Sequence, residues 1–451
     1  MSFCQYIKPI SISLSPNTEK DDIFLAFKLI FQPWLWKNPS TSSGQVADLE
    51  EEFKKYLGVK YAISFNSGRS ALMAILNSLG LNQDDEVLLQ AFTCNAAVNP
   101  ILWSGLKPVY VDCNEETLNI DIKDLKRTLQ KIQGKKPKVL MVQHTFGLPA
   151  FAKASEGKPA EMDEILNVCQ ENNLILIEDC AHSLGAAYKG KRIGTFGQAA
   201  FFSFGRDKII SSVYGGMAIT NDHSLAEKIR QFQGKLNYPS YYWILQQLLH
   251  PILVNYLILP AYGLNQYLGR ILLGFFHVLP ILSKSVYKKE KDGKIPGYFP
   301  KKLPNALAIL ALNQFKKLEK FISHQREIAK IYDENLNELG FILPKENLER
   351  IYMRYPILIE NEDTDKILKM ARKKRLFLND GWRKTPIVPP DTDQNKMQYL
   401  LGSCPKAEKI AKNILNLPTH INISQKEAKK IIEFLKNMPG SEISTAAGKQ
   451  K

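Results

Sequence analysis

The sequence predicts an α/β fold with a mostly parallel central sheet, followed by a smaller C-terminal α+β domain. Between residues 61 and 222, short apolar runs alternate with helical patterns, which is typical of βαβ units. The apolar runs show no polar alternation, as expected for parallel strands that are buried on both faces. With 451 residues, of which 45% are hydrophobic and 23% charged, the chain can form two or three packed units. This composition excludes a mainly disordered or fibrous protein.

The first region is expected to contain seven strands separated by helices. The predicted strands cover Tyr61–Phe65, Glu86–Gln90, 108–112, 138–143, 174–178, 199–204 and 217–220. The predicted helices between them include 69–79, 124–132 and 161–171. Ligands of such sheets gather at the carboxyl ends of the strands, so the polar residues that end these strands are the first candidates for a site.

The pattern changes after residue 300. Residues 305–336 form one long amphipathic helix pattern, and two strand-like runs (355–359 and 376–378) and a closing helix (425–438) follow it. We therefore predict five parts: an N-terminal extension (1–44), a large α/β domain with the candidate ligand site (45–235), an apolar helical insertion (236–300), a linking helix with a small domain (301–438) and a mobile tail (439–451).

The chain is basic, and its cysteines are scattered. Lys and Arg number 60 against 45 Asp and Glu, a net charge of +15 that favours phosphates, nucleic acid or an anionic membrane face as partners. Nucleic-acid binding is not expected, because no helix-turn-helix or RNP-type pattern accompanies the charge. The six cysteines show no Cys-x-x-Cys spacing, so neither a metal site nor a disulfide framework is predicted. We see no signal peptide and predict a cytoplasmic protein.

The stretch 238–282 is unusually apolar, and Arg270 is its one formal charge. Three prolines, Pro251, Pro260 and Pro280, are expected to cut it into pieces. Most of these pieces are far shorter than the ~20 residues of a spanning helix, so a bilayer span is not predicted.

Two interpretations of this insertion stay open. It can be a helical hairpin that is buried against a partner subunit, or a peripheral contact with the inner face of the cell membrane. In the second case, aromatic residues would lie at headgroup level and lysines would meet anionic lipid: Tyr241, Tyr242, Trp243, Lys284, Lys288, Lys289 and Lys291. The segment 24–36 has a similar character and is expected to join the same surface. Both interpretations imply an interface.

Residues that can carry chemistry concentrate at the ends of the predicted strands. Asp179 ends a buried apolar strand, where a carboxylate needs a cation such as a protonated pyridine, or several hydrogen bonds. Ser203 closes another strand, and Lys208 follows in a turn where a desolvated amine can form a Schiff base. The junction at 65–70 leads from a strand into a helix, whose first N–H groups can hold a phosphate. Together these features suit pyridoxal 5′-phosphate (PLP).

Several longer motifs make this interpretation more specific. In order, they are SGRSAL, DEVLLQAFTCNAAVNPILWSGLKPVYVD, QHTFGLP, EDCAHSLGA, GTFGQAAFFSF and YGGMAITND. Their order resembles the DegT/DnrJ/EryC1/StrS family of PLP-dependent sugar aminotransferases, which have the aspartate aminotransferase fold (fold type I). The likeness covers most of residues 44–438 apart from the apolar insertion.

This resemblance implies roles for individual residues. Lys208 would be the catalytic lysine that carries the cofactor, and Asp179 would pair with the pyridinium nitrogen. His182 would stand beside the phenolic oxygen of the ring, and Cys94 takes a position where the family often has a stacking aromatic residue. Four residues would bind the phosphate: Ser67, Gly68, Arg69 and Ser203. Of these, the arginine replaces the family's usual threonine and would add a cation.

Simpler interpretations stay open for some of these residues. Asp179 could cap a helix, Ser203 could merely end its strand, and His182 could be a structural histidine. The family's Asn-Tyr-Arg element, which reaches the phosphate of the neighbouring subunit, is replaced here by 297–306, where a lysine would substitute.

By the same resemblance, we expect an aminotransferase that moves an amino group from glutamate to a keto-sugar, most simply a nucleotide-linked one, in polysaccharide or glycoconjugate biosynthesis. A homodimer with the site at the subunit interface is expected. Two alternatives stay open: a PLP-dependent sugar dehydratase, and a non-catalytic membrane-associated or regulatory protein on the same fold. Lys208 argues against the dehydratase, because such family members lack the lysine. The presence of Lys208, Asp179 and Ser203 together argues against a non-catalytic protein.

Overall fold

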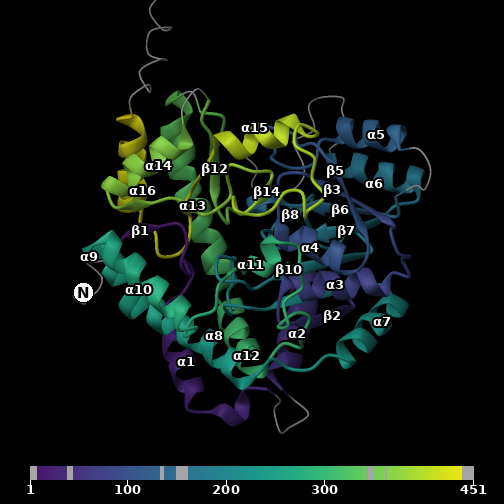
Figure 1. Ribbon diagram of the computed structural model, residues 1–451, viewed down its shortest axis with the longest axis horizontal. Coiled ribbons are helices and arrows are strands. Elements are labelled where there is room, and N and C mark those ends of the chain that lie inside the picture. Colours follow the sequence, from purple (N-terminus) through teal and green to yellow (C-terminus); the bar gives the residue numbers. More distant parts are fainter. Residues whose placement is uncertain are drawn as a thin grey trace, which may run out of the picture.

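The computed structural model describes residues 8–37, 44–132, 137–148, 161–339, 341–343, 350–360 and 363–438. The predicted tail 439–451 lies outside the described residues. A large α/β domain contains the central sheet, and a smaller domain lies against one side of it at the top left of Figure 1. The apolar insertion and the N-terminal helix α1 (Lys20–Ile30) form the lower left of the same view.

The central sheet has seven strands in the order β2-β11-β10-β7-β6-β3-β5. They are β2 (Tyr61–Phe65), β3 (Glu86–Gln90), β5 (Lys107–Val111), β6 (Val139–Gln143), β7 (Ile175–Asp179), β10 (Ala199–Ser203) and β11 (Gly216–Thr220). β11 runs antiparallel to both of its neighbours, and the other pairs are parallel. Each predicted strand agrees with an observed one to within one residue at either end. The predicted α/β fold with a mostly parallel sheet is therefore confirmed.

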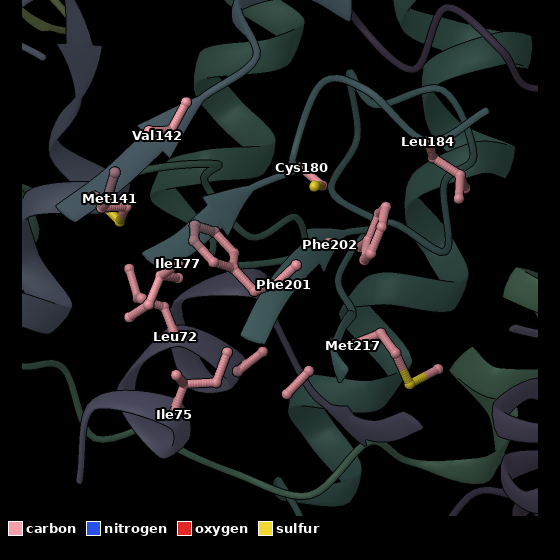
Figure 2. Packing of buried hydrophobic residues seen from close by; sticks show 14 of the residues in the cluster. Leu72, Ile75, Met141, Val142, Ile177, Cys180, Leu184, Phe201, Phe202 and Met217 are labelled. Atoms are coloured by element: carbon pink, nitrogen blue, oxygen red, sulfur yellow. The ribbon is translucent and has the colours of Figure 1, made fainter. Parts of the chain in front are cut away.

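Helices cover the sheet and bury its apolar side chains. They are α2 (Gln45–Leu57), α3 (Gly68–Ser78), α4 (Asn95–Trp103), α5 (Ile122–Lys131), α6 (Glu161–Asn172) and α7 (His223–Gly234). Figure 2 shows Leu72 and Ile75 of α3 beneath Ile177 of β7 and Phe201 of β10. All four side chains are almost completely buried. This packing fixes the start of α3 against the carboxyl ends of the strands.

The smaller domain is built from the C-terminal part of the chain together with one N-terminal strand. Its elements are α13 (Leu318–Leu336), β12 (Tyr355–Leu358), α14 (Thr364–Lys373), β13 (Leu376–Phe377), α15 (Pro405–Asn413), β15 (Ile414–Leu417) and α16 (Gln425–Lys436). β12 pairs with β15, and β1 (Ile10–Ser11) pairs with β13. A further pair, β4 (Thr93–Cys94) with β14 (Ile387–Val388), joins the two domains. Short elements occur between the larger ones: η2 (Pro33–Leu35), η3 (Thr145–Gly147), β8 (Ala187–Tyr188), β9 (Lys191–Arg192), α11 (Lys288–Lys291) and η5 (Asn337–Leu339).

The prediction of one continuous helix over 305–336 is wrong. The structure has α12 (Asn305–Phe315) and α13, separated at Lys316 and Lys317. α12 is buried almost all round and packs between α1 and α2, whereas α13 has one polar face. The side chain of Lys317 is held by both Asp21 and Asp22 of α1, at 2.7 and 2.9 Å. The turn lets each half pack against a different surface.

Two of the predicted breaks in the insertion are also wrong. Pro251 and Pro260 lie within one helix, Tyr241–Leu264, that comprises α8 (Tyr241–Leu253), a π-helical turn η4 (Val254–Ile258) and α9 (Leu259–Leu264). The wider π turn lies between the prolines and accommodates the backbone groups that they leave without partners. The chain breaks instead at Asn265, whose side chain accepts the Tyr267 N–H at 2.8 Å and caps α10 (Gln266–Val278).

The insertion is a helical hairpin. α10 runs back along α9 and η4, and after it the Pro280 carbonyl accepts the Tyr242 hydroxyl at 2.7 Å. The helix Tyr241–Leu264 has 24 residues and a mean hydropathy of 1.3, enough by length and composition to cross a membrane. However, 61% of the most apolar stretch of this helix is buried inside the fold, where the helix packs against α1 and α12 among others. This burial is typical of a core helix.

Candidate active site

One cavity of about 370 Å³ brings together every residue predicted for the site. It lies where β7 and β10 end, beside the start of α3. Its lining includes all eight: Ser67, Gly68, Arg69, Cys94, Asp179, His182, Ser203 and Lys208. Residues that are more than 100 positions apart in the chain therefore meet because their strands end at the same edge of the sheet.

Asp179 is a buried acid at the end of β7. Its side chain accepts the N–H of Ala181 at 3.0 Å, and the residue is 5% exposed. Burial raises the pKa of the Asp179 carboxyl, although the Ala181 hydrogen bond and the charge of Lys208 act in the opposite direction. A cation placed in the cavity would offset this desolvation and favour the charged carboxylate.

Lys208 lies in the turn that follows β10. Its N–H donates to the Gly205 carbonyl at 3.1 Å. The amide of Asn17 donates to the carbonyls of Lys208 and Ile209, at 2.9 and 3.0 Å. Burial lowers the pKa of the Lys208 amine to about 8; Arg354 acts in the same direction, while Cys94 and Asp179 oppose it. A much larger fraction of this amine is neutral than for a surface lysine.

His182 is buried and uncharged. Its Nδ1 accepts the N–H of Phe146 at 3.3 Å, so the ring proton of the neutral imidazole is on Nε2. The ring stacks on Phe146 at 5.5 Å and meets the edge of Trp382 at 4.9 Å. Burial lowers the pKa of His182 well below its usual value, and the charges of Lys208 and Arg354 add to this. The imidazole can therefore donate a hydrogen bond without bringing a charge.

The start of α3 forms an anion cradle. Ser67 caps the helix, because its hydroxyl accepts the Ser70 N–H at 3.1 Å. A Cβ atom on Gly68 would lie 3.0 Å from the Cβ of Ser203, so this close approach of helix and strand requires glycine. The first N–H groups of a helix have no partner within it, and here they border the cavity.

Arg69 lines the cavity, but its charge is already paired. Its guanidinium forms an ion pair with the fully buried Glu290 and donates to the Ser285 carbonyl at 3.2 Å. It also lies over the ring of Phe299, 4.5 Å from the centroid. Arg69 therefore holds residues 285–290, which follow the apolar hairpin, over the cavity. Glu290 neutralises the Arg69 cation, which was expected to bind the phosphate.

Cys94 is the N-cap of α4. Its sulfur accepts the Ala96 N–H at 3.5 Å, and its strand pairs with Val388 of β14. Burial raises the pKa of the Cys94 thiol, so this residue is a neutral thiol. An aromatic ring that the sequence did not suggest, Trp382, lines the same cavity from the smaller domain.

Several other lining residues were not predicted. They are Gln143, Arg206, Tyr214, Lys291, Arg354, Asp380 and Trp382. Arg354 and Asp380 form an ion pair at 2.7 Å in which both side chains are almost fully buried. Both lie in the smaller domain, and no local pattern links them to the strand ends. Arg206 could have been found, because it lies two positions before Lys208.

These residues fit PLP. A buried acid suits a protonated ring nitrogen, a lysine amine with a lowered pKa suits an aldehyde, and the start of α3 with Ser203 suits a phosphate. A neutral imidazole that donates from Nε2 suits a phenolic oxygen. The fold and this set of donors define a PLP-dependent aminotransferase of fold type I.

Comparison with known sequences narrows this class. The chain belongs to the DegT/DnrJ/EryC1/StrS aminotransferase family, which matches residues 33–235 and 279–436. The predicted family, its fold class and its cofactor are therefore confirmed. The unmatched residues include all of α1 and nearly all of the helical hairpin.

Similar proteins cover nearly the whole chain. A GDP-perosamine synthase from Escherichia coli O157:H7 is 27% identical over 88% of this chain and 90% of its own length. A dTDP-4-dehydro-2,3,6-trideoxy-D-glucose 4-aminotransferase from Saccharopolyspora spinosa is 26% identical, covering 89% of each chain. Among solved structures, DesI with its TDP-sugar product has a TM-score of 0.68 at 18% identity, over 98% of this chain and 96% of its own. At this identity the structure supports the fold alone.

Proposed function

We propose that this enzyme transfers an amino group from glutamate to a keto-sugar linked to a nucleotide diphosphate, in polysaccharide or glycoconjugate biosynthesis. The observation that carries this proposal is that Lys208 and Asp179 line one cavity with an anion cradle at the start of α3. The relatives named GDP-perosamine synthase and dTDP-4-dehydro-2,3,6-trideoxy-D-glucose 4-aminotransferase support a nucleotide-linked sugar as the acceptor.

Each site residue has a distinct task in this proposal. When bound, PLP supplies an aldehyde that holds the migrating amine and a protonated ring that accepts an electron pair. Asp179 would keep the ring nitrogen protonated, and His182 would donate from Nε2 to the phenolic oxygen. Lys208 Nζ would take the proton from the α-carbon of the amino donor and then return a proton, acting as base and then as acid. Ser203 would hold the phosphate together with the start of α3.

The charges around the cavity suit an anionic substrate. Arg206, Lys291 and Arg354 line it in addition to Lys208, but Arg354 and Lys291 are paired with Asp380 and Asp391. Within the described residues Arg206 has no ion pair, so it can meet a carboxylate of glutamate or the diphosphate of a nucleotide sugar.

We further propose that the enzyme is a cytoplasmic homodimer whose subunits meet near this cavity. The family resemblance supports the dimer. We also propose that residues 238–282 contact the inner face of the cell membrane, which agrees with the exposed apolar side chains of the hairpin.

Amino transfer can be followed by isotope labelling. The purified enzyme is incubated with PLP, ¹⁵N-glutamate and 4-keto sugars linked to dTDP or GDP, and the products are analysed by mass spectrometry. We expect ¹⁵N in the sugar nucleotide, and none with Lys208→Arg. A product that has lost a hydroxyl group without gaining nitrogen would favour the dehydratase instead. An unchanged sugar nucleotide with every acceptor would favour the non-catalytic alternative.

A further inference from the structure

A second cavity, of about 240 Å³, lies between the helical hairpin and the smaller domain. Its lining comes from three segments that are distant in sequence: residues 9–14, residues 262–273 and residues 368–379. Most of the lining side chains are apolar, including Tyr262 and Phe377, whose rings meet edge to face at 5.4 Å. This cavity is separate from the one that contains Lys208, since the two share no lining residue.

Two arginines line this apolar cavity, Arg270 exposed and Arg372 partly buried, and in the described part of the chain neither has a counter-ion. Arg270 comes from α10 and Arg372 from α14, and no acidic residue is among the lining residues. Within the part of the chain that the structure describes, neither guanidinium has an ion pair or a hydrogen bond. Burial lowers the pKa of Arg372, and the charge of Arg270 lowers it further. Two cations that repel each other are stabilised by a shared anion.

The exposed face of α10 beside this cavity is apolar. Tyr267, Ile271, Phe275 and Val278 are between 53% and 80% exposed. Their spacing of four, four and three residues places them along one face of the helix. A continuous apolar face of this kind on a folded protein marks an interaction surface.

We propose that this cavity and the adjoining face of α10 bind an anionic phospholipid at a bilayer surface. The phosphate lies between Arg270 and Arg372, and the acyl chains lie against the apolar face. This inference rests on the proposed membrane contact of 238–282 and names its ligand. Arg270 and the apolar face of α10 lie outside the residues that the family matches, whereas Arg372 lies within them.

Charge favours a lipid over a second copy of the chain as the occupant. Between Glu227 and Glu290 there is no acidic residue, so the hairpin carries no charge that could pair with Arg270 of another copy. An anionic bilayer supplies both the phosphate and an apolar phase. The contact is peripheral, since the helix Tyr241–Leu264 is largely packed into the fold. Ser285 and Val286 follow the hairpin closely and line the cavity of Lys208, so docking places that cavity near the membrane.

Vesicle flotation of the full-length holoenzyme tests this site. We compare vesicles of phosphatidylcholine alone with vesicles that also contain phosphatidylglycerol. The enzyme is expected to float with the anionic vesicles only. Arg270→Gln combined with Arg372→Gln is expected to reduce the floated fraction at least about tenfold, because each cation near an anionic surface contributes to binding. A control that also removes two positive charges is Lys60→Gln with Lys228→Gln. Lys60 precedes β2 and Lys228 belongs to α7, and Figure 1 shows both elements on the side away from α9 and α10, so this variant should float like the parent.

Further arms distinguish the lipid from other occupants. Ile271→Ser with Phe275→Ser, which alters only exposed positions, should abolish flotation. Inorganic phosphate at constant ionic strength should not release the enzyme from vesicles. Release would assign the site to free phosphate and contradict the proposal that a phospholipid occupies it. Flotation of the Arg270→Gln and Arg372→Gln double variant equal to that of the parent would also contradict this proposal.

Sedimentation tests whether a second copy of the chain covers this face. A halved mass of the Ile271→Ser and Phe275→Ser variant, with flotation retained, would assign the face to a second copy. Amino transfer in solution should be unchanged in all variants, so failure here is separable from failure of the proposed activity.

Discussion

At the scale of single residues, the site combines a lysine that loses its proton easily with an acid that is costly to ionise. Burial lowers the pKa of Lys208 and raises that of Asp179, so the cavity alone disfavours charge on both side chains. Opposite shifts of this kind are typical of sites that move protons. A protonated cofactor ring would restore the charge of the acid.

The lysine leads to a prediction about pH. Only a neutral amine can attack an aldehyde, so the rate at which the apoenzyme captures PLP should follow deprotonation of Lys208. The rate is expected to rise about tenfold per pH unit and to level off above a pH of about 8. Stopped-flow absorbance measures it. A rate that rises steadily towards pH ~10.5, the ordinary lysine value, would contradict the lowered pKa.

Asp179→Asn should separate stability from function. The amide can still accept the Ala181 N–H, and it removes the cost of ionising a buried acid. Since the folded pKa of Asp179 is raised, the folded apoprotein binds more protons than the unfolded chain. The free energy of unfolding of the apoprotein therefore falls as the pH rises above the pKa that Asp179 has in the unfolded chain. The Asp179→Asn variant should not show this decrease.

The apoprotein of Asp179→Asn is thus expected to melt at an equal or higher temperature than the parent near neutral pH. Amino transfer should drop by roughly 10²–10³-fold, as for the loss of one preorganised electrostatic contact. Calorimetry and the isotope assay measure the two effects. A lower melting temperature together with full activity would show that the acid has only a structural role.

At the scale of elements, the turn that carries Lys208 is held by a distant segment. Asn17, which precedes α1, is 2% exposed and donates to two carbonyls of this turn. Asn17→Ala is expected to cost about 1–3 kcal/mol in the free energy of unfolding, because both carbonyls lose a buried partner. PLP capture should also slow.

Asn305→Ala is the control for this prediction. Asn305 is 1% exposed and donates to the carbonyl of Leu35 at 2.9 Å, and in the described part of the chain no hydrogen bond joins it to the Lys208 turn. The variant should also lose stability in denaturant unfolding but keep the parent rate of PLP capture. Equal slowing in both variants would mean that Asn17 does not position the turn.

Most elements could be predicted because their patterns are local. Continuous apolar runs identified the buried strands, and the helix after residue 424 begins with the capping pattern of Ser424 and Glu427. The errors arose where packing overrides propensity. Pro251 is tolerated next to a π turn, and the helical pattern of 305–336 is split because its halves pack against different surfaces.

The residues of the candidate site could likewise be predicted where a local pattern marks them, and not where long-range packing brings them in. Asp179, Ser203 and Lys208 lie at or near strand ends, where an α/β sheet brings ligands together, so the sequence could place them in one site. Arg354 and Trp382 reach the cavity only because the smaller domain docks there, and no periodicity reports such long-range packing.

At the scale of the whole molecule, one buried carboxylate joins the insertion to the cofactor site. Glu290 follows the hairpin, is fully buried, and pairs with Arg69 at the start of α3. Its other oxygen accepts the Tyr298 hydroxyl and the Tyr287 N–H, both at 3.0 Å. Glu290, together with the Arg69–Ser285 hydrogen bond, thereby connects the segment after the hairpin to the anion cradle.

Glu290→Ala should therefore destabilise the protein strongly. Removing one partner of a buried pair leaves Arg69 uncompensated, which typically costs about 3–5 kcal/mol. The affinity of the folded protein for PLP should rise, because Arg69 loses the carboxylate that neutralises it and can pair with the phosphate. Equilibrium unfolding and PLP titration measure both effects. The exposed Glu334, which faces Lys330 at 3.9 Å, is the control, and its change to Ala should leave both values as they are.

The central claim is that Lys208 is the residue that holds PLP. It is tested most directly by reducing the native holoenzyme with borohydride, digesting it and locating the fixed cofactor by mass spectrometry. We expect a pyridoxyl group on the peptide that contains Lys208, and none in Lys208→Arg. Attachment to another lysine, or no attachment to the wild-type chain, would contradict the account.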